Sequence, residues 1–396
     1  MSEPSEPSEP VESVESDVVE RLVVHVDDEV LDDLRDRLAR TRFPDQIAGT
    51  GWEYGTPIPY VRELVDHWRD EYDWREQEVA LNGLFHCRTV IDGQPLHFVH
   101  ERSPHEDALP LLLVHGWPGS IVEFLDVIPR LTHPEEFGGT AADAFHVVAP
   151  SLPGYGFSPP PTETGWDIVR TARAFVTLMD RLWYHGYGAQ GGDWGAQITT
   201  RMAALDPDHM VGLHLNMALA VPPADLGPLT DGEQADLAAM AAFQRDEGAY
   251  AQLQMTKPQT LAMGLNDSPA GLLAWIVEKF RTWSDCGGDV ESAFDRDRLL
   301  TNVMLYWVTQ TAASSTRLYW ETLHSGALRR PLERVTVPTG VARYPGEVVI
   351  RYPRSWVEQT YNVTHWAELP RGGHFAAMEQ PDLFVDNLRT FFRTVR

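Results

Sequence analysis

The sequence predicts an α/β protein with a mostly parallel sheet, and three observations support this fold class. Continuous apolar runs that alternate with helical segments begin at Leu109, as the buried strands of a parallel sheet require. A glycine-rich turn from strand to helix is centred on Asp193. Strand signals then stop between Asn216 and Val335, and a stretch of that length indicates a helical subdomain inserted into the sheet domain.

These signals divide the chain into five segments. They are a disordered acidic tail (1–17), an N-terminal accessory region (18–107), the first part of the sheet domain (108–218), a helical cap (219–332) and the second part of the sheet domain (333–396). The tail repeats Ser-Glu-Pro and cannot bury enough apolar surface to fold. In the accessory region we expect a strand at 22–26, amphipathic helices at about 28–41 and 59–72, and a hairpin with strands 84–91 and 94–100 around Asp92-Gly93.

The sheet domain is predicted from alternating apolar runs and helical periodicity. Expected strands are 111–114, 145–150, 182–189, 210–216, 335–341 and 364–369, and expected helices are 121–131, 169–182, 196–205 and 381–393. The functional loops of such a domain gather at the carboxyl ends of the strands.

Composition excludes several classes of function. The formal net charge of -26 argues against nucleic acid and anionic membranes as partners. No apolar run approaches the roughly 20 residues of a membrane span, so we expect a cytoplasmic protein without a membrane partner. Cys87 and Cys286 form neither a disulfide framework nor a metal motif, and no metal or organic cofactor is expected. Only Lys257 and Lys279 are lysines, which fits either a high-salt cytoplasm or a GC-rich genome.

The run Gly191-Gly-Asp-Trp-Gly195 has the outline of a nucleophile elbow, in which a strained turn presents one side chain at its tip. That side chain is Asp193. An aspartate is ionised at neutral pH and can attack a carbon that bears a leaving group, which forms an ester on the enzyme. A general base and an oxyanion hole must then help water to cleave the ester. The five residues alone fit an ordinary capped turn equally well.

Other loops supply the groups that this chemistry needs. Backbone N–H groups of Trp117 and Trp194 are the expected oxyanion donors of an α/β-hydrolase fold. His374 lies in a glycine turn before the last helix and is the predicted base, oriented by Glu347 after a late strand. The rival acid position, Asn216, carries no charge.

His115 precedes a glycine turn, in His115-Gly-Trp-Pro. We interpret it as an anchor of that loop rather than as a catalytic base. The chain contains no Gly-x-Ser-x-Gly motif, which argues against a serine esterase.

The chain resembles the epoxide hydrolases of the α/β-hydrolase fold, in their microsomal-type branch, from about residue 20 to its end. The matching motifs are His115-Gly-Trp-Pro, Gly191-Gly-Asp-Trp-Gly, Thr256-Lys-Pro, Leu265-Asn-Asp-Ser-Pro, the run from Leu299 to Trp307, and Arg371-Gly-Gly-His-Phe-Ala-Ala. The resemblance implies a triad of Asp193, Glu347 and His374. It also implies that Tyr250 and Tyr319 of the cap bind the epoxide oxygen. Microsomal members carry a membrane anchor, whereas this chain starts with an acidic tail, so membrane localisation is not expected.

The resemblance predicts conversion of epoxides to vicinal diols, with a small-molecule epoxide and water as the partners. Phenols suit this reaction, because ring opening produces an alkoxide that needs a proton. Close helix packing explains Tyr319 equally well from the residues alone. Two alternative functions stay open at this point: a haloalkane-type dehalogenase with the same aspartate, and a catalytically inactive binding protein. The oligomeric state stays open between a monomer and a homo-oligomer.

Overall fold

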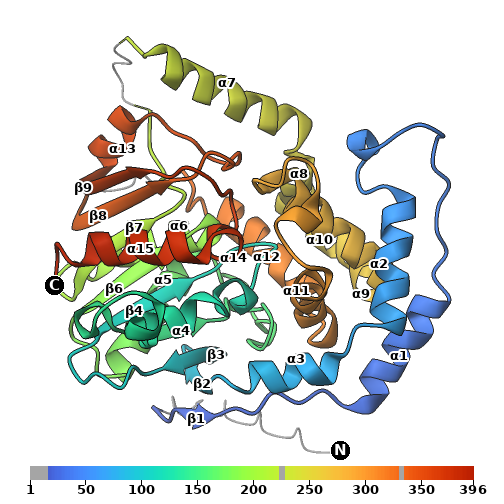
Figure 1. The fold of residues 1–396 in the computed structure, drawn as a ribbon, viewed down its shortest axis with the longest axis horizontal. Coiled ribbons are helices and arrows are strands. Elements are labelled where there is room, and N and C mark those ends of the chain that lie inside the picture. The colour runs from blue at the N-terminus through green and yellow to red at the C-terminus, as the bar shows by residue number, and fades with distance from the viewer. Residues whose placement is uncertain (1–16, 223–227, 330–333) are drawn as a thin grey trace, which may run out of the picture.

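A single mixed sheet forms the centre of the computed structural model, which describes residues 17–222, 228–329 and 334–396 (Figure 1). The strand order within these residues is β1-β2-β3-β5-β4-β6-β7-β8-β9. The strands are β1 (Glu20–Arg21), β2 (His86–Ile91), β3 (Gln94–Glu101), β4 (Leu109–Val114), β5 (Phe145–Pro150), β6 (Tyr187–Gly191), β7 (Met210–Leu215), β8 (Val335–Arg343) and β9 (Tyr361–Glu368). From β5 to β9 all neighbours are parallel, which confirms the predicted fold class.

The predicted hairpin is confirmed, and it extends the sheet rather than standing apart from it. Ile91 pairs with Gln94 around Asp92 and Gly93, whose φ angles of 52° and 73° suit a tight hairpin turn. Strand β3 then pairs with β5 in antiparallel fashion. The accessory region and the sheet domain therefore share one set of backbone hydrogen bonds.

The predicted strand at 22–26 is wrong, because strand β1 ends at Arg21. The backbone N–H groups of Val24 and Val26 donate instead to side chains near the helix α3 (Trp74–Leu81), namely Asn82 at 2.8 Å and Glu78 at 2.7 Å. Both valines are buried. The alternating apolar pattern is thus real, but after Leu22, whose N–H donates to His86 of β2, the backbone partners are side chains and not a strand. Helix α3 was not predicted from the sequence.

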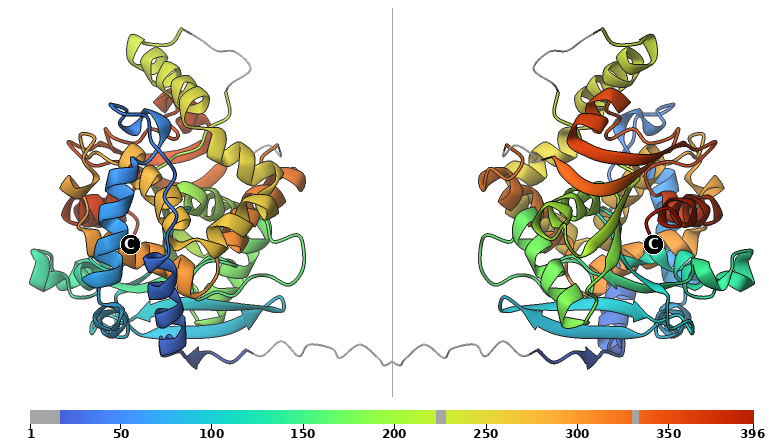
Figure 2. Two further views of the ribbon diagram at one scale, coloured as in Figure 1. Left: turned by 90° about the vertical axis from the view of Figure 1, so that its right-hand side faces the viewer. Right: turned by 90° about the vertical axis from the view of Figure 1, so that its left-hand side faces the viewer.

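The helices of the sheet domain cover both faces of the sheet, and Figure 2 shows them on opposite sides. One face carries α5 (Ile168–Arg181) and α6 (Asp193–Leu205), and the other carries α4 (Val127–Thr132) and α15 (Pro381–Phe392). The expected helix at 121–131 is divided into a 3-10 turn at Ile121–Phe124 and α4. Pro129 explains the break, because it lacks an N–H and its ring clashes with the carbonyl four residues earlier. Two further helices of this domain are α13 (Arg354–Thr360) and α14 (Ala376–Glu379).

Most of the described residues between β7 and β8 are helical, as predicted. Its helices are α7 (Asp231–Asp246), α8 (Ala249–Thr256), α9 (Pro258–Asp267), α10 (Pro269–Trp283), α11 (Arg296–Val308) and α12 (Ala312–His324). The N-terminal helices α1 (Asp28–Ala39) and α2 (Ile58–Asp70) pack against α10 and lie along this cap (Figure 1). Polar contacts reinforce the packing, including His67 Nε2 to Asp297 at 2.7 Å and Tyr72 to Thr301 at 3.0 Å.

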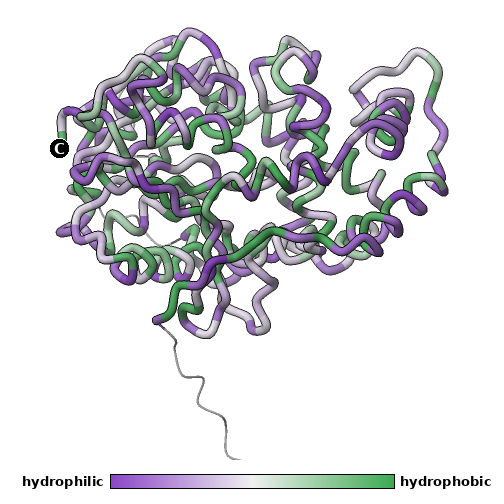
Figure 3. Tube along the Cα trace, turned by 60° about the horizontal axis from the view of Figure 1, so that its bottom comes forward, coloured by the Kyte–Doolittle hydropathy of each residue, from purple (hydrophilic) through white to green (hydrophobic). Residues whose placement is uncertain are grey.

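The hydropathy trace shows apolar residues distributed through the helices and strands alike (Figure 3). None of the helices in the described ranges is both long and apolar enough to span a membrane. The predicted tail lies outside the described residues except for Asp17, which forms an ion pair with Arg181 at 2.9 Å.

A buried carboxylate, Asp143, forms an ion pair that links the C-terminal end of the chain to the sheet domain. Asp143 is 1% exposed and accepts two bonds from the Arg393 guanidinium, at 2.6 and 2.7 Å, and one from the Thr140 N–H at 2.9 Å. The hydrogen bonds from Arg393, opposed by burial, hold the pKa of Asp143 below its usual range. Its ionised form therefore stabilises the fold.

We expect Asp143→Asn to lower the free energy of unfolding by about 1–3 kcal/mol at pH 7, because it weakens the bonds to a buried group. The pKa of Asp143 is lower in the folded state than the unfolded value of about 3.9, so this stabilisation exists above pH 4 and is lost as pH falls through the folded pKa. Urea unfolding at pH 7 checks the first statement, and a series of measurements at pH values falling from about 5 towards the folded pKa checks the second. Asp382→Asn is the control, since that carboxylate is 80% exposed. Equal effects of the two variants would contradict the prediction.

Candidate active site

The strained turn predicted at Asp193 is present at the junction of β6 and α6. Asp193 is the first residue of α6 and has a φ of 46°, in the left-handed region that costs energy for any residue other than glycine. The flanking glycines are required by close approach. A Cβ on Gly195 would lie 1.9 Å from the carbonyl oxygen of Val114 in β4, and one on Gly191 would lie 2.4 Å from the carbonyl oxygen of Gly195. The aspartate is thereby held at the carboxyl end of the central strands.

The loop after β4 lies directly against the Asp193 carboxylate. The backbone N–H of Trp117 donates a hydrogen bond of 2.8 Å to Asp193 Oδ1. A Cβ on Gly116 would lie 2.2 Å from the same oxygen, so only glycine allows this approach. The second expected donor, the N–H of Trp194, lies in the first turn of α6, where helix N–H groups lack intrahelical partners.

His374 and Glu347 meet Asp193 from the far end of the chain. His374 Nδ1 lies 2.9 Å from Glu347 Oε2, and His374 Nε2 lies 3.6 Å from Asp193 Oδ2. The other oxygen of Glu347 accepts the Val349 N–H at 2.7 Å. Burial opposes a charge on His374, but the Glu347 and Asp193 carboxylates outweigh it and raise the pKa of His374 well above its usual value. The imidazole is therefore cationic while Asp193 is ionised.

Asn216 and His115 lie beside the site and hold the residues around it through hydrogen bonds. Asn216 Oδ1 accepts from Gln190 at 2.9 Å, and its amide donates to the backbone oxygen of His374 at 3.4 Å. His115 Nε2 accepts the N–H of Leu152 at 3.2 Å, while its Nδ1 lies 2.9 Å from the Gly116 carbonyl oxygen. Burial lowers the pKa of His115 to about 4, so it stays neutral. It anchors the loop, as predicted.

Both predicted tyrosines come from the cap and lie beside the loop of Trp117. The Tyr250 ring stacks on the Trp117 ring at 5.2 Å and 10°, and the Tyr319 ring meets the Trp194 ring edge-on at 4.7 Å. The Tyr319 hydroxyl is buried and has no hydrogen-bond partner in the described part of the chain. Burial raises the pKa of both phenols, with the Asp193 charge contributing, so both are neutral proton donors. Because this hydroxyl lies near Asp193, it is available to a ligand bound there.

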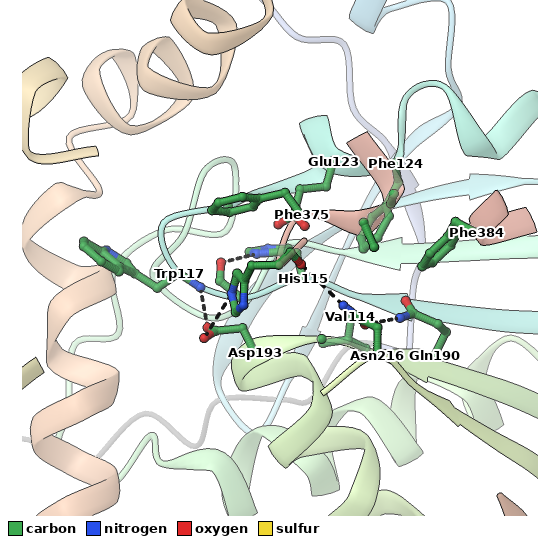
Figure 4. A pocket seen from close by; sticks show the side chains of 16 residues that line it. Val114, His115, Trp117, Glu123, Phe124, Gln190, Asp193, Asn216, Phe375 and Phe384 are labelled. Carbon is green, nitrogen blue, oxygen red and sulfur yellow. Dashed lines mark hydrogen bonds and ion pairs between the residues drawn. The ribbon is translucent and has the colours of Figure 1, made fainter. Parts of the chain in front are cut away.

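A small cavity lies next to Asp193, and Figure 4 shows the residues that line it. Its volume of about 20 Å³ is enough for one ordered water molecule. Asp193, His374, Gly116 and Glu123 border it. All of its lining residues belong to the sheet domain, and none of them comes from the cap helices.

Two residues at this site were missed by the sequence reading. Trp283 is fully buried, and its ring lies 5.0 Å from the His374 ring and 5.1 Å from the Tyr250 ring. No pattern distinguishes it among the 13 tryptophans of the chain. Glu123 could have been noticed as a lone acid in the apolar run Ile121-Val-Glu-Phe, eight residues after His115. Within the described ranges, no group of histidine, cysteine and acidic side chains could hold a metal ion.

The fold and this arrangement define a class of protein, an α/β-hydrolase with a carboxylate in the position of the nucleophile. Two family models agree with that assignment. The model for the epoxide hydrolase N terminus matches residues 19–124, and the model for the alpha/beta hydrolase fold matches residues 110–330.

Comparison with individual proteins identifies the family within this class. A putative epoxide hydrolase of Stigmatella aurantiaca is 48% identical over 94% of this chain and 84% of its own length. Epoxide hydrolase 1 of Sus scrofa is 39% identical, over 93% of this chain and 87% of its own. The crystal structure of juvenile hormone epoxide hydrolase from Bombyx mori superposes with a TM-score of 0.90 at 32% identity, covering 98% and 96% of the two chains. The Aspergillus niger epoxide hydrolase gives a TM-score of 0.86 at 32% identity, covering 97% and 98%.

The chain belongs to the microsomal-type epoxide hydrolases, and its activity is the hydrolysis of epoxides to diols. The dehalogenase and the inactive binding protein, which the sequence left open, are therefore set aside.

Proposed function

We propose that this epoxide hydrolase works in two steps through an ester on Asp193. The observation that carries the proposal is the position of the Asp193 carboxylate, between the N–H of Trp117 at 2.8 Å and the His374 imidazole at 3.6 Å. A carboxylate in that place can attack carbon directly, and the histidine then has no nucleophile to deprotonate. The histidine is free to activate water instead.

In the first step, an Asp193 oxygen attacks one epoxide carbon. The bond between that carbon and the epoxide oxygen breaks, and its electron pair stays on the oxygen. Tyr250 and Tyr319 bind this oxygen, and one phenol gives it a proton as general acid. The neutral state of both phenols and the unpartnered hydroxyl of Tyr319 support this role.

Ester formation then converts His374 from an acid into a base. The Asp193 charge is one of the causes that keep the imidazole protonated, and the ester removes that charge. The pKa of His374 consequently falls, and the imidazolium returns a proton to the phenolate. The neutral imidazole is now ready to accept a proton from water, with Glu347 holding its orientation.

In the second step, water attacks the carboxyl carbon of the ester while His374 Nε2 takes one of its protons. The N–H groups of Trp117 and Trp194 stabilise the oxyanion on the Asp193 group. The bond between the carboxyl carbon and the substrate oxygen breaks, and His374 protonates the departing diol. The new carboxylic acid of Asp193 gives its proton to His374, which restores the ion pair.

The test is His374→Gln with a reactive epoxide in excess. We expect alkylation to continue and ester hydrolysis to slow by at least about 10²-fold, because the general base is absent. Intact-mass measurement should show protein plus one substrate, and peptide mapping should place it on Asp193. His365→Gln makes the same change in strand β9 and should not accumulate the adduct. An unmodified His374→Gln protein would contradict the proposal.

A further inference from the structure

Glu123 is a carboxyl group of the site that neither step uses. It belongs to the 3-10 turn Ile121–Phe124, which follows the loop of Trp117, and it borders the same cavity as Asp193 and His374. Figure 4 shows its side chain entering from one side of the cavity and Asp193 from the other. A Cβ on Gly119 would lie 1.7 Å from Glu123 Oε1, so the carboxyl group occupies space that only glycine leaves open.

The surroundings of Glu123 make its presence costly unless it has a partner. Burial raises its pKa to about 8, with Asp193 and Glu379 adding to the rise, whereas His374 and the Gly116 backbone lower it. The Tyr306 hydroxyl, which also belongs to this region, donates to the Gly119 carbonyl oxygen at 2.6 Å and is not available to Glu123. Glu123 is partly buried and its carboxyl group borders the cavity, so a polar ligand there would offset the cost of its burial.

We propose that Glu123 is a positioning residue that holds the hydrolytic water against the ester of Asp193. A buried water needs two to four polar partners. The cavity offers His374 Nε2 for one of its protons and a Glu123 oxygen for the other, which leaves a lone pair directed at the carboxyl carbon. A carboxyl group keeps an acceptor oxygen in either protonation state, so Glu123 can hold the water although its pKa is raised.

This inference rests on the two-step reaction proposed above, and the experiment separates the two. In single turnovers of the wild type, transient accumulation of the ester tests the two-step reaction. The variant Glu123→Leu removes the acceptor oxygen. We expect its rate of alkylation to stay within about threefold of wild type and its rate of ester hydrolysis to fall about 10- to 100-fold, because the attacking water is no longer held in place. In the steady state kcat and KM should then fall together.

The conservative variant Glu123→Gln keeps an acceptor oxygen and should restore most of the hydrolysis rate. Gly119→Ala displaces the carboxyl group without removing it and should slow hydrolysis selectively, like Glu123→Leu. Glu101→Leu is the matched control, because Glu101 is another partly buried carboxyl with a raised pKa, on strand β3 and outside the cavity. Hydrolysis at the wild-type rate in Glu123→Leu and Gly119→Ala would overturn the inference, as would an equal loss of alkylation and hydrolysis.

Discussion

Replacing Tyr250 and Tyr319 together with phenylalanine should slow alkylation of Asp193 by about 10²–10⁴-fold, the range expected when general acid catalysis is lost. Ring opening puts a negative charge on the epoxide oxygen, and both phenols are neutral donors beside the site. Each single variant should keep weak activity, because the remaining hydroxyl still donates. Hydrolysis of the ester should change much less, since the phenols act on the substrate oxygen and not on water.

Rapid-quench measurement of the ester in the two single variants and the double variant distinguishes these steps. Tyr187→Phe is the control, because Tyr187 is also buried but bonds to Asp206 at 2.9 Å, far along strand β6 from the elbow. Alkylation of the double variant at the wild-type rate would rule out the phenols as the acid.

Gly116→Ala should reduce alkylation by at least about 10²-fold while the protein stays folded. The new Cβ would lie 2.2 Å from Asp193 Oδ1 and 2.4 Å from Asp193 Cβ, so the carboxylate must move. Its hydrogen bond from the Trp117 N–H would then lengthen or break. A shift of about 1 Å in a reacting group is enough for a loss of that size.

Single-turnover kinetics measure the rate of alkylation, and a thermal melt shows whether the variant is folded. Gly264→Ala in helix α9 is the matched control, because its Cβ would meet no atom within 4 Å. That change should leave the reaction intact and slightly favour the helix. If Gly116→Ala reacts like Gly264→Ala, the close approach of the loop to Asp193 is not required for the reaction.

Local rules explain why so much of the fold could be predicted from the sequence. The hairpin at Asp92-Gly93 depends on two residues that accept positive φ, and the structure has both. The elbow depends on glycines next to Asp193. A strand before it and a helix after it are both present, although the strand begins at Tyr187 and not at the predicted residue 182. The false strand at 22–26 shows the limit of such rules. Alternating burial reveals a buried face, but it does not reveal which element supplies the backbone partners.

The order of groups along the chain also allowed Asp193, Glu347 and His374 to be proposed as one site. In a parallel sheet the carboxyl ends of the strands meet at one edge, so residues that follow different strands become neighbours. The structure places the His374 imidazole between the other two carboxylates, at 2.9 and 3.6 Å.

The sequence by itself therefore determined the α/β framework, the elbow with its aspartate, and the histidine and acid that follow it, because each depends on residues close together in the chain or on strand order. Only the tertiary structure decided that Trp283 lies against His374 and Tyr250, and that Glu123 borders the cavity next to Asp193. Those positions come from the packing of the cap and of a 3-10 turn against distant loops. Packing of that kind depends on the shapes of many side chains at once and leaves no periodic signal in the sequence.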